Sequence, residues 1–269
     1  MAIQTIGFIG LGNMAKAMIG GILKKKIVSP EDIIGSAATQ ETRDKVSASF
    51  GIQTRESNAQ VAKEADILIL AVKPQYFKVV IADIMDDVDA DKLVISVAAG
   101  KTIKWISDEF EKPVKLIRVM PNTPALVGEG CTAVCRNELV SDEELNFAME
   151  IFCSFGTASV VAENLMEVVG GVSGSAPAYA FIFIEAMADA AVLNGMPREK
   201  AYKFAAQSVL GSAKMVLETG KHPGKLKDDV CSPGGTTIEA VYSLEESGFR
   251  AAVMEAVDAC TQKSKNMGK

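Results

Sequence analysis

The chain has 269 residues, of which 48% are hydrophobic, and a formal net charge of −6. This length suits one large domain or two ordinary ones, and either size can bury a proper core. The basic residues form no stripe with interleaved aromatic residues, so a nucleic-acid partner is not expected. We expect no signal peptide and no membrane partner, because no uncharged apolar stretch reaches the length of a membrane span, although 179–193 is strongly apolar.

The cysteine and histidine content restricts the chemistry. Five cysteines are an odd number with no Cys-x-x-Cys spacing, which predicts reduced, mostly buried thiols in a cytoplasmic protein. His222 is the only histidine, so a zinc site or a histidine-based triad is nearly excluded and no metal is expected. The chemistry must use something other than an imidazole base, unless His222 alone supplies one.

An apolar run leads directly into Gly10-Leu11-Gly12-Asn13-Met14-Ala15, and a helical pattern follows. This is the Gly-x-Gly-x-x-Ala form of the dinucleotide-binding fingerprint, although the glycines could simply make a tight turn. Gly10 permits the turn, Gly12 removes a side chain that would block the pyrophosphate, and Ala15 lets the helix lie close to the sheet. The pyrophosphate would meet the free N–H groups at the helix N-terminus. The candidate cofactor contacts here are Ile9, Gly10, Leu11, Gly12, Asn13 and Met14.

Short β-rich runs alternate with helical stretches over residues 1–161, which predicts a parallel, doubly wound sheet. Two of the runs are continuously apolar, as expected for strands covered on both faces. Ser57 with Gln60, and Ser141 with Glu144, have the spacing of a capping box and predict two helix starts. The expected strands are 4–9, 32–36, 66–72, 92–98, 114–119, 130–135 and 157–161.

The strand signal ends near residue 162, and a helical pattern takes over. Gly195 and Pro197 are expected to separate the first two helices, and Gly248 the last two. The first of these helices is too continuously apolar for a lone exposed helix, which predicts burial, with a second subunit as one candidate cover. The expected helices are 176–194, 197–219, 236–246 and 248–265.

The end of the second strand indicates which nicotinamide cofactor binds. NAD-selective folds place an acid there to bind the ribose 2′-hydroxyl, whereas the first acid here is Glu41, already inside the next helix. Ser36 and Thr39 can donate hydrogen bonds to a 2′-phosphate, and Arg43 can supply its counter-charge. Alternatively, Ser36 and Thr39 only cap the helix. NADP(H) is therefore favoured, without excluding NAD(H).

Two further strand ends are expected at the same carboxyl edge of the sheet, where such folds bind ligands. Pro74 would open the helix after the fourth strand, and small residues after the fifth leave room for a flat nicotinamide ring. Both segments could also be ordinary strand-to-helix turns. The further cofactor candidates are Asn58, Ala71, Val72, Lys73, Pro74, Val97, Ala98 and Ala99.

Two segments of the second half combine small residues with a helix start. Residues 233–235, Pro-Gly-Gly, make a sharp turn before Thr236, which is expected to be the N-cap of a capping box with Glu239. Residues 173–177, Ser-Gly-Ser-Ala-Pro, make a similar feature. Each alone is more often just a capped helix, but two helix N-termini facing one cleft would bind a carboxylate without an arginine.

Taken together, these motifs resemble the pyrroline-5-carboxylate reductase family over nearly the whole chain. The resemblance implies an NADP-binding Rossmann domain with a doubly wound parallel sheet, residues 1–161, followed by an all-α dimerisation and substrate domain, residues 162–269. It also implies a homodimer or a larger ring of dimers, with the active site between one subunit's cofactor domain and its partner's helices. The motifs that carry it are Gly-Phe-Ile-Gly-Leu-Gly-Asn-Met-Ala (7–15), Ala-Val-Lys-Pro (71–74), Met-Pro-Asn-Thr-Pro (120–124), Ser-Gly-Ser-Ala-Pro-Ala-Tyr (173–179), His-Pro-Gly-Lys-Leu-Lys-Asp (222–228) and Ser-Pro-Gly-Gly-Thr-Thr-Ile (232–238).

The resemblance implies reduction of 1-pyrroline-5-carboxylate to L-proline, the last step of proline biosynthesis. NADPH would deliver hydride to the C=N carbon of this cyclic imine carboxylate. Thr237 matches the family's threonine proposed to hydrogen-bond the ring nitrogen, and a single histidine suffices because imine reduction needs hydride placement more than a strong base. The substrate-binding candidates are Ser173, Ser175, Asp229, Gly235, Thr236 and Thr237.

Two positions depart from the family pattern. Ala176 stands where the family commonly has glycine, which could narrow the pocket. Asp229 matches a position that can be asparagine, and its charge is unfavourable near a carboxylate substrate unless it points away. His222 is expected to be a hydrogen-bonding loop residue and not a catalyst.

Two other functions remain open on the sequence. A β-hydroxyacid dehydrogenase would share the opening strand and glycine turn, but it is expected to carry a lysine one turn into the helix near 174, and residues 176–194 contain none. A non-catalytic NADPH-binding sensor would signal redox state through its helical dimer and leave pyrroline-5-carboxylate unreduced.

Overall fold

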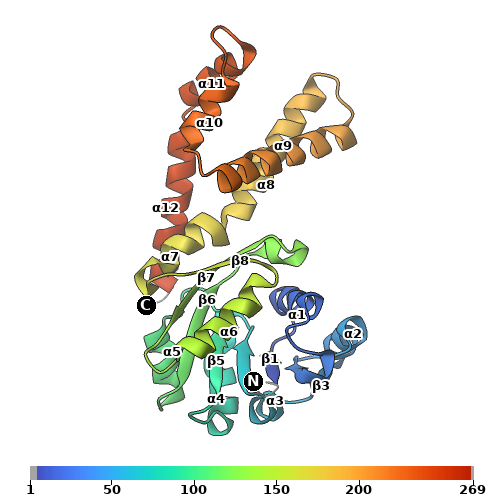
Figure 1. Cartoon of the computed structure of the whole chain (residues 1–269), viewed down its shortest axis with the longest axis vertical. Coiled ribbons are helices and arrows are strands. Elements are labelled where there is room, and N and C mark those ends of the chain that lie inside the picture. Colours follow the sequence, from blue (N-terminus) through green and yellow to red (C-terminus); the bar gives the residue numbers. More distant parts are fainter. Residues whose placement is uncertain (1–4, 268–269) are drawn as a thin grey trace. The chain divides into compact units, whose positions relative to one another are not determined.

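The computed structural model describes residues 5–267 and divides the chain into two compact units (Figure 1). The first unit runs to Gly174 and includes the end of the chain from Cys260, and the second is Ser175–Ala259. Residues 162–174 therefore pack with the first unit, downstream of the domain boundary expected from the end of the strand signal.

The first unit contains an eight-stranded sheet in the order β3-β2-β1-β4-β5-β6-β7-β8. All neighbouring strands are parallel except β6 and β7, which confirms the predicted doubly wound α/β fold. The β6–β7 pair is antiparallel because the short connection 121–129 turns the chain back without a crossover helix. The strands are β1 (Ile6–Ile9), β2 (Ile33–Ser36), β3 (Gln53–Arg55), β4 (Ile67–Leu70), β5 (Leu93–Ser96), β6 (Lys115–Met120), β7 (Gly130–Arg136) and β8 (Gly156–Val160).

Six helices cover the two faces of this sheet (Figure 1). Side chains alternate along each strand, so in β4 Ile69 packs with the layer of α1, α2 and α6, whereas Leu68 and Leu70 pack with the layer of α3, α4 and α5. Burial on both faces explains why these strands are continuously apolar. The helices are α1 (Asn13–Lys25), α2 (Gln40–Phe50), α3 (Asn58–Glu64), α4 (Phe77–Ile84), α5 (Ile103–Phe110) and α6 (Asp142–Cys153).

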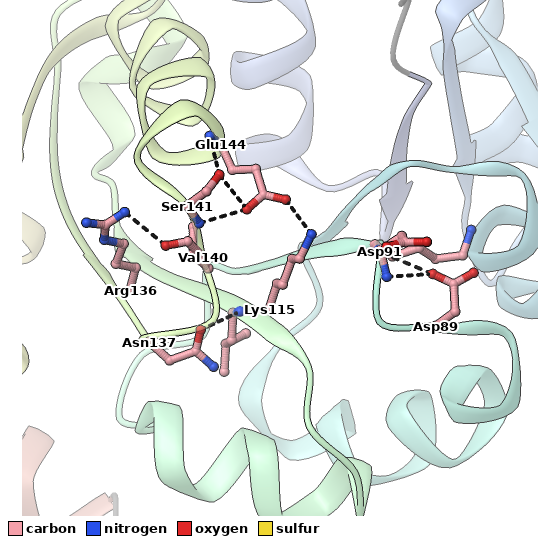
Figure 2. A network of polar contacts seen from close by, with 10 residues as sticks. Asp89, Asp91, Lys115, Arg136, Asn137, Val140, Ser141 and Glu144 are labelled. Atoms are coloured by element: carbon pink, nitrogen blue, oxygen red, sulfur yellow. Dashed lines mark hydrogen bonds and ion pairs between the residues drawn. The ribbon is translucent and has the colours of Figure 1, made fainter.

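Both predicted capping boxes are present. Ser57 and Gln60 exchange side-chain-to-backbone hydrogen bonds at the start of α3, and Ser141 and Glu144 do so at the start of α6 (Figure 2). Glu144 also lies 2.8 Å from Lys115, which joins α6 to β6. Although burial opposes ionisation, hydrogen bonds from Lys115 and Ser141 hold the pKa of Glu144 below its ordinary value.

The second unit is helical, as predicted, but the short helix α10 was missed. Gly195 and Gly248 have positive φ values of 90° and 73° at the turns where breaks were expected. α8 packs against α9 around Ala188, Ala201 and Ala205. The helices are α8 (Ala176–Leu193), α9 (Arg198–Thr219), α10 (Pro223–Val230), α11 (Thr236–Glu246) and α12 (Phe249–Met267), the last of which extends into the first unit.

The helical run Glu163–Leu193 is long and apolar enough to cross a membrane by length and composition, although it is not the uncharged stretch that the expectation concerned, because it contains four acidic residues. This is weak evidence by itself, because helices covered by protein pass the same test. Large apolar side chains on α8 are exposed in the single chain, with Phe181 63% and Ile182 66% exposed. Such a surface needs a cover, and a protein partner provides one as well as lipid does.

Two adjacent glycines in α1 allow a stability test. A Cβ on Gly21 would lie 2.8 Å from both the Cβ of Phe155 and the Oγ of Ser154, whereas a Cβ on Gly20 would meet only the ring of Phe50, at 3.5 Å. Gly21→Ala should lower the free energy of unfolding by about 1–3 kcal/mol through overpacking. Gly20→Ala should raise it by up to about 1 kcal/mol through helix propensity. Urea unfolding followed by the fluorescence of Trp105, at one protein concentration, measures both, and equal effects would contradict this packing.

Candidate active site

The turn between β1 and α1 has the backbone that the fingerprint predicts. Gly10 has a φ of +95°, and a Cβ there would lie 2.8 Å from the carbonyl oxygen of Ala71. Gly12 is the N-cap of α1, and a Cβ there would meet no atom within 4 Å. No side chain caps this helix and its first turn carries no acid. Free N–H groups therefore face open space at a positive helix end, which fits a bound pyrophosphate.

Backbone hydrogen bonds join the ends of four parallel strands on one edge of the sheet. The N–H of Gly10 donates to the carbonyl of Ser36 at 3.0 Å, that of Ala71 to Ile9 at 2.8 Å, and that of Val97 to Leu70 at 3.3 Å. The loops that follow β1, β2, β4 and β5 thus start side by side. The strand ends, these loops and the first residues of α1 hold most of the predicted cofactor residues, whose contacts with the cofactor stay a prediction: Ile9, Gly10, Leu11, Gly12, Asn13, Met14, Ser36, Ala71, Val72, Lys73, Pro74, Val97, Ala98 and Ala99.

Ser36 and Thr39 already have hydrogen-bond partners within the chain. The buried hydroxyl of Ser36 donates to Oδ1 of Asn58 at 2.7 Å, which links β2 to the start of α3. Thr39 is the N-cap of α2 and accepts from the N–H of Thr42 at 3.3 Å. Thr39 therefore caps α2, whereas Ser36 bonds to Asn58 and caps no helix; a contact of either hydroxyl with a 2′-phosphate stays a prediction.

A cation lies beside the end of β2. The guanidinium of Arg43 donates to the carbonyl of Ala37 and to Oε1 of Gln40, each at 2.6 Å. The first acid after β2, Glu41, forms an exposed ion pair with Lys45. The charge at this strand end thus suits a 2′-phosphate better than a bare 2′-hydroxyl.

The loop after β4 is a short turn and not yet a helix. Lys73 is the exposed N-cap of a 3₁₀ turn, Pro74–Tyr76, which leads into α4 at Phe77. Pro74 therefore opens this segment as predicted, one turn ahead of the α-helix proper. In the loop after β5, the N–H of Ala98 donates to Oγ of Ser96 at 3.3 Å.

Ser173 lies in a π-helical turn, Gly170–Gly174, that follows the short helix α7 (Met166–Val169). Its hydroxyl donates to the carbonyl of Val169 at 3.1 Å, and its own carbonyl accepts from Nδ2 of Asn122 at 3.0 Å. Oδ1 of Asn122 accepts from the N–H of Cys131 at 2.8 Å. Sequence reasoning quoted the Met-Pro-Asn-Thr-Pro motif but gave Asn122 no role.

Arg118 is a buried charge that sequence reasoning missed. It is 0% exposed on β6, and its Nη1 and Nη2 contact Glu163 at 3.1 Å and Glu167 at 2.7 Å. Glu163 also accepts from the N–H of Ile103 at 2.6 Å. Burial above all, with the nearby glutamates, raises the pKa of the Cys135 thiol to about 12, so this thiol stays protonated. An arginine within an apolar strand was the available signal.

The start of α11 corrects one prediction. Gly235 and not Thr236 is the N-cap, so Thr236 opens the helix and forms no capping box with Glu239. Gly235 takes the extended N-cap conformation, with φ −81° and ψ 169°, and no side chain caps the helix. The first N–H groups of α11 are thereby left for another acceptor, and Thr237 is half-buried in this first turn.

The charge of Asp229 is balanced within α10. Its carboxylate lies 2.6 Å from Nζ of Lys225, and this hydrogen bond holds the pKa of Asp229 below its ordinary value. His222 is the N-cap of α10, where its Nδ1 accepts from the N–H of Gly224 at 3.1 Å. Ser175 is the N-cap of α8. The convergence of the α8 and α11 N-termini on one substrate stays a prediction.

The described residues offer no metal-ligand cluster, and the cysteines differ in their burial. Among residues 5–267, no group of three or more His, Cys, Asp or Glu side chains could hold a metal ion. Of the five cysteines, only Cys135 is buried, while Cys131 and Cys153 are exposed and Cys231 and Cys260 are half-buried. The expectation of mostly buried thiols was therefore wrong.

Comparisons with known proteins agree with this geometry. Residues 163–267 match the family model described as pyrroline-5-carboxylate reductase dimerisation, and residues 5–100 match the model described as NADP oxidoreductase coenzyme F420-dependent. The chain is 54% identical over 269 residues to the pyrroline-5-carboxylate reductase of Escherichia coli, covering 99% of each chain.

Two solved structures have nearly the same fold. Pyrroline carboxylate reductase from Plasmodium falciparum, with NADP bound, has a TM-score of 0.91 at 34% identity and covers 99% of this chain and 98% of its own. A pyrroline-5-carboxylate reductase from Coxiella burnetii has a TM-score of 0.92 at 35% identity and covers 99% of both. The chain therefore belongs to the pyrroline-5-carboxylate reductase family.

Proposed function

We propose that this chain reduces 1-pyrroline-5-carboxylate to L-proline with NADPH as the hydride donor. The observation that carries the proposal is the edge where four strand ends meet in front of the open N-terminus of α1. A relative named pyrroline-5-carboxylate reductase aligns with this chain over 99% of its own length. The proposal places the activity in the cytoplasm, in keeping with an odd number of cysteines that have no Cys-x-x-Cys spacing.

The cofactor site would work mainly through the backbone. The first N–H groups of α1 would hold the pyrophosphate, and Arg43 would pair with the 2′-phosphate. The small residues Ala98 and Ala99 would leave space for the nicotinamide ring beside Ala71 and Val72. When bound, NADP(H) supplies the hydride; the protein's task is to fix the position of the ring.

The substrate site would use hydroxyl and N–H donors. The Gly235–Thr236 turn at the start of α11 and the Ser173–Ser175 segment would bind the substrate carboxylate. The Thr237 hydroxyl would hydrogen-bond the ring nitrogen, which gains a proton as the C=N carbon receives hydride. Asp229, held by Lys225, would stay clear of the substrate carboxylate.

We also propose that the functional boundary lies near residue 162, where the dimerisation model begins within one residue. The exposed apolar side chains of α8 would then be covered in a homodimer. Several such dimers would assemble into a larger ring. Analytical ultracentrifugation of the protein measures the oligomeric state directly, and a stable monomer would contradict the proposed dimer.

The oxidation of NADPH with pyrroline-5-carboxylate tests the function against its two rivals. Turnover should be seen with this imine and not, in the reverse direction, with a short-chain hydroxy acid, because α8 has no lysine to act on an alcohol. Binding of NADPH without turnover would instead support a non-catalytic sensor.

Gly12→Val should abolish NADPH binding while the protein still folds. The added side chain would enter the space in front of α1 without meeting protein, because a Cβ there has no neighbour within 4 Å. NADPH fluorescence measures the binding and the Trp105 unfolding curve measures the fold. Retained enhancement of NADPH fluorescence would refute the role of this turn.

Arg43→Ala should raise the KM for NADPH by about 10- to 100-fold, as expected for a lost charge-assisted hydrogen bond. The KM for NADH should change less than threefold, since NADH has no 2′-phosphate. Steady-state kinetics with both cofactors give the comparison, with Lys45→Ala on the same helix as control. A wild-type enzyme with a large preference for NADH would overturn the cofactor assignment.

Thr237→Val, which keeps the shape and removes the hydroxyl, should lower kcat by about 10- to 1,000-fold. The affinity for NADPH should stay nearly unchanged. Thr237→Ser, which keeps the hydroxyl, should retain most of the activity. Steady-state kinetics and NADPH titration test this, and wild-type turnover in Thr237→Val would remove the assigned role.

A further inference from the structure

The segment that carries Ser173 is not held by regular secondary structure. It passes from the four-residue helix α7 into the π-helical turn Gly170–Gly174. π-helical turns are rare and unfavourable by themselves, so the surrounding structure must hold this one in place.

Strand β6 and the loop that follows it hold the segment at two points. At the beginning of the segment, buried Arg118 contacts Glu163 and Glu167, which lie on either side of the start of α7. At the end of the segment, Nδ2 of Asn122 donates to the carbonyl of Ser173. Both points come from one buried strand and the loop that follows it, so the position of the segment is set by the sheet.

Asn122 is the link nearest to Ser173. Its side chain is nearly buried, at 8% exposed, and bridges two backbone groups that are far apart in sequence, the N–H of Cys131 and the carbonyl of Ser173. Both ends of the amide are used in the orientation that each bond requires. Without the Asn122 amide, the Ser173 carbonyl would lose this hydrogen-bond donor. The π-helical turn would then no longer be linked to Cys131 on β7.

We propose that Asn122 is a positioning residue for substrate binding: it fixes the Ser173 turn so that the turn can receive the substrate carboxylate. The inference rests on the proposed function and on the substrate role of Ser173 within it. Because misplacement of a binding group by about 1 Å can cost on the order of 100-fold, two hydrogen bonds at this amide have kinetic consequences.

A matched control lies at the opposite end of β6. Oδ1 of Asn137 accepts from the N–H of Leu116 at 3.1 Å (Figure 2). Its Nδ2 donates to the carbonyl of Val114 at 2.8 Å. Like Asn122, Asn137 uses both ends of its amide on backbone groups, but its two partners lie two positions apart in sequence and away from Ser173. Asn137→Ala reports what the loss of such a bridge does to the fold alone.

The test compares Asn122→Ala with Asn137→Ala in the full-length enzyme. Both should lower the midpoint of urea unfolding by a similar amount. Asn122→Ala should raise the KM for pyrroline-5-carboxylate and the Kd for L-proline by about 10- to 100-fold, with kcat and NADPH affinity changed less than threefold. Asn137→Ala should change none of these constants more than threefold.

Equal kinetic effects of the two variants would overturn the inference, as would an unchanged KM in Asn122→Ala. If Asn122→Ala does not fold, Asn122→Leu, which keeps most of the volume, provides the same comparison. A wild-type enzyme that fails to reduce pyrroline-5-carboxylate would count against the proposed function, whereas a wild-type enzyme that is active beside a kinetically normal Asn122 variant would count only against the positioning role.

Discussion

Hydrogen bonds between neighbouring strand ends are the constraint on which the rest of the site depends. The backbone N–H groups of Gly10, Ala71 and Val97 each donate to the carbonyl of the last residue of the adjacent strand. The strands β2, β1, β4 and β5 therefore end side by side. Parallel register makes every following loop leave from the same edge. The chain can therefore collect one binding surface from residues that are up to about ninety positions apart in sequence.

Glycine N-caps appear at two of the helix starts where an anion is proposed to bind. Gly12 precedes α1 and Gly235 precedes α11, and neither helix receives a side-chain cap. A serine or aspartate at these positions would stabilise the helix but occupy its N–H groups. In a chain with a net charge of −6, these helix ends offer local positive potential without a cluster of arginines.

The sequence predicts what depends on local pattern. Continuous apolar runs gave β4 and β5, and hydroxyl-to-acid or hydroxyl-to-amide spacing gave the starts of α3 and α6. The prediction failed where a residue that is near in space, but not in the local sequence pattern, determines the secondary structure. β3 is three polar residues long and exists because it pairs with β2, and Thr236 lost the N-cap position to Gly235, whose backbone already has the required conformation.

The candidate site shows the same division. The turn at Gly10 and Gly12 has a sequence signature because the backbone itself makes the site. The partners of Ser36 and Arg118 lie 22 and 45 to 49 positions away, and the bond of Asn122 to Ser173 spans 51 positions, so no local spacing reveals these contacts. Side chains that reach across the fold become interpretable only when the register of the sheet is known.

The central claim is that hydride passes from the bound nicotinamide to the imine carbon. The most direct measurement uses NADPH carrying deuterium at C4, in each of its two stereochemical forms, with unlabelled pyrroline-5-carboxylate and analysis of the proline by mass spectrometry and NMR. One of the two forms should yield L-proline with a single deuterium on the δ-carbon. Proline without deuterium from both forms, or no proline at all, would contradict the account.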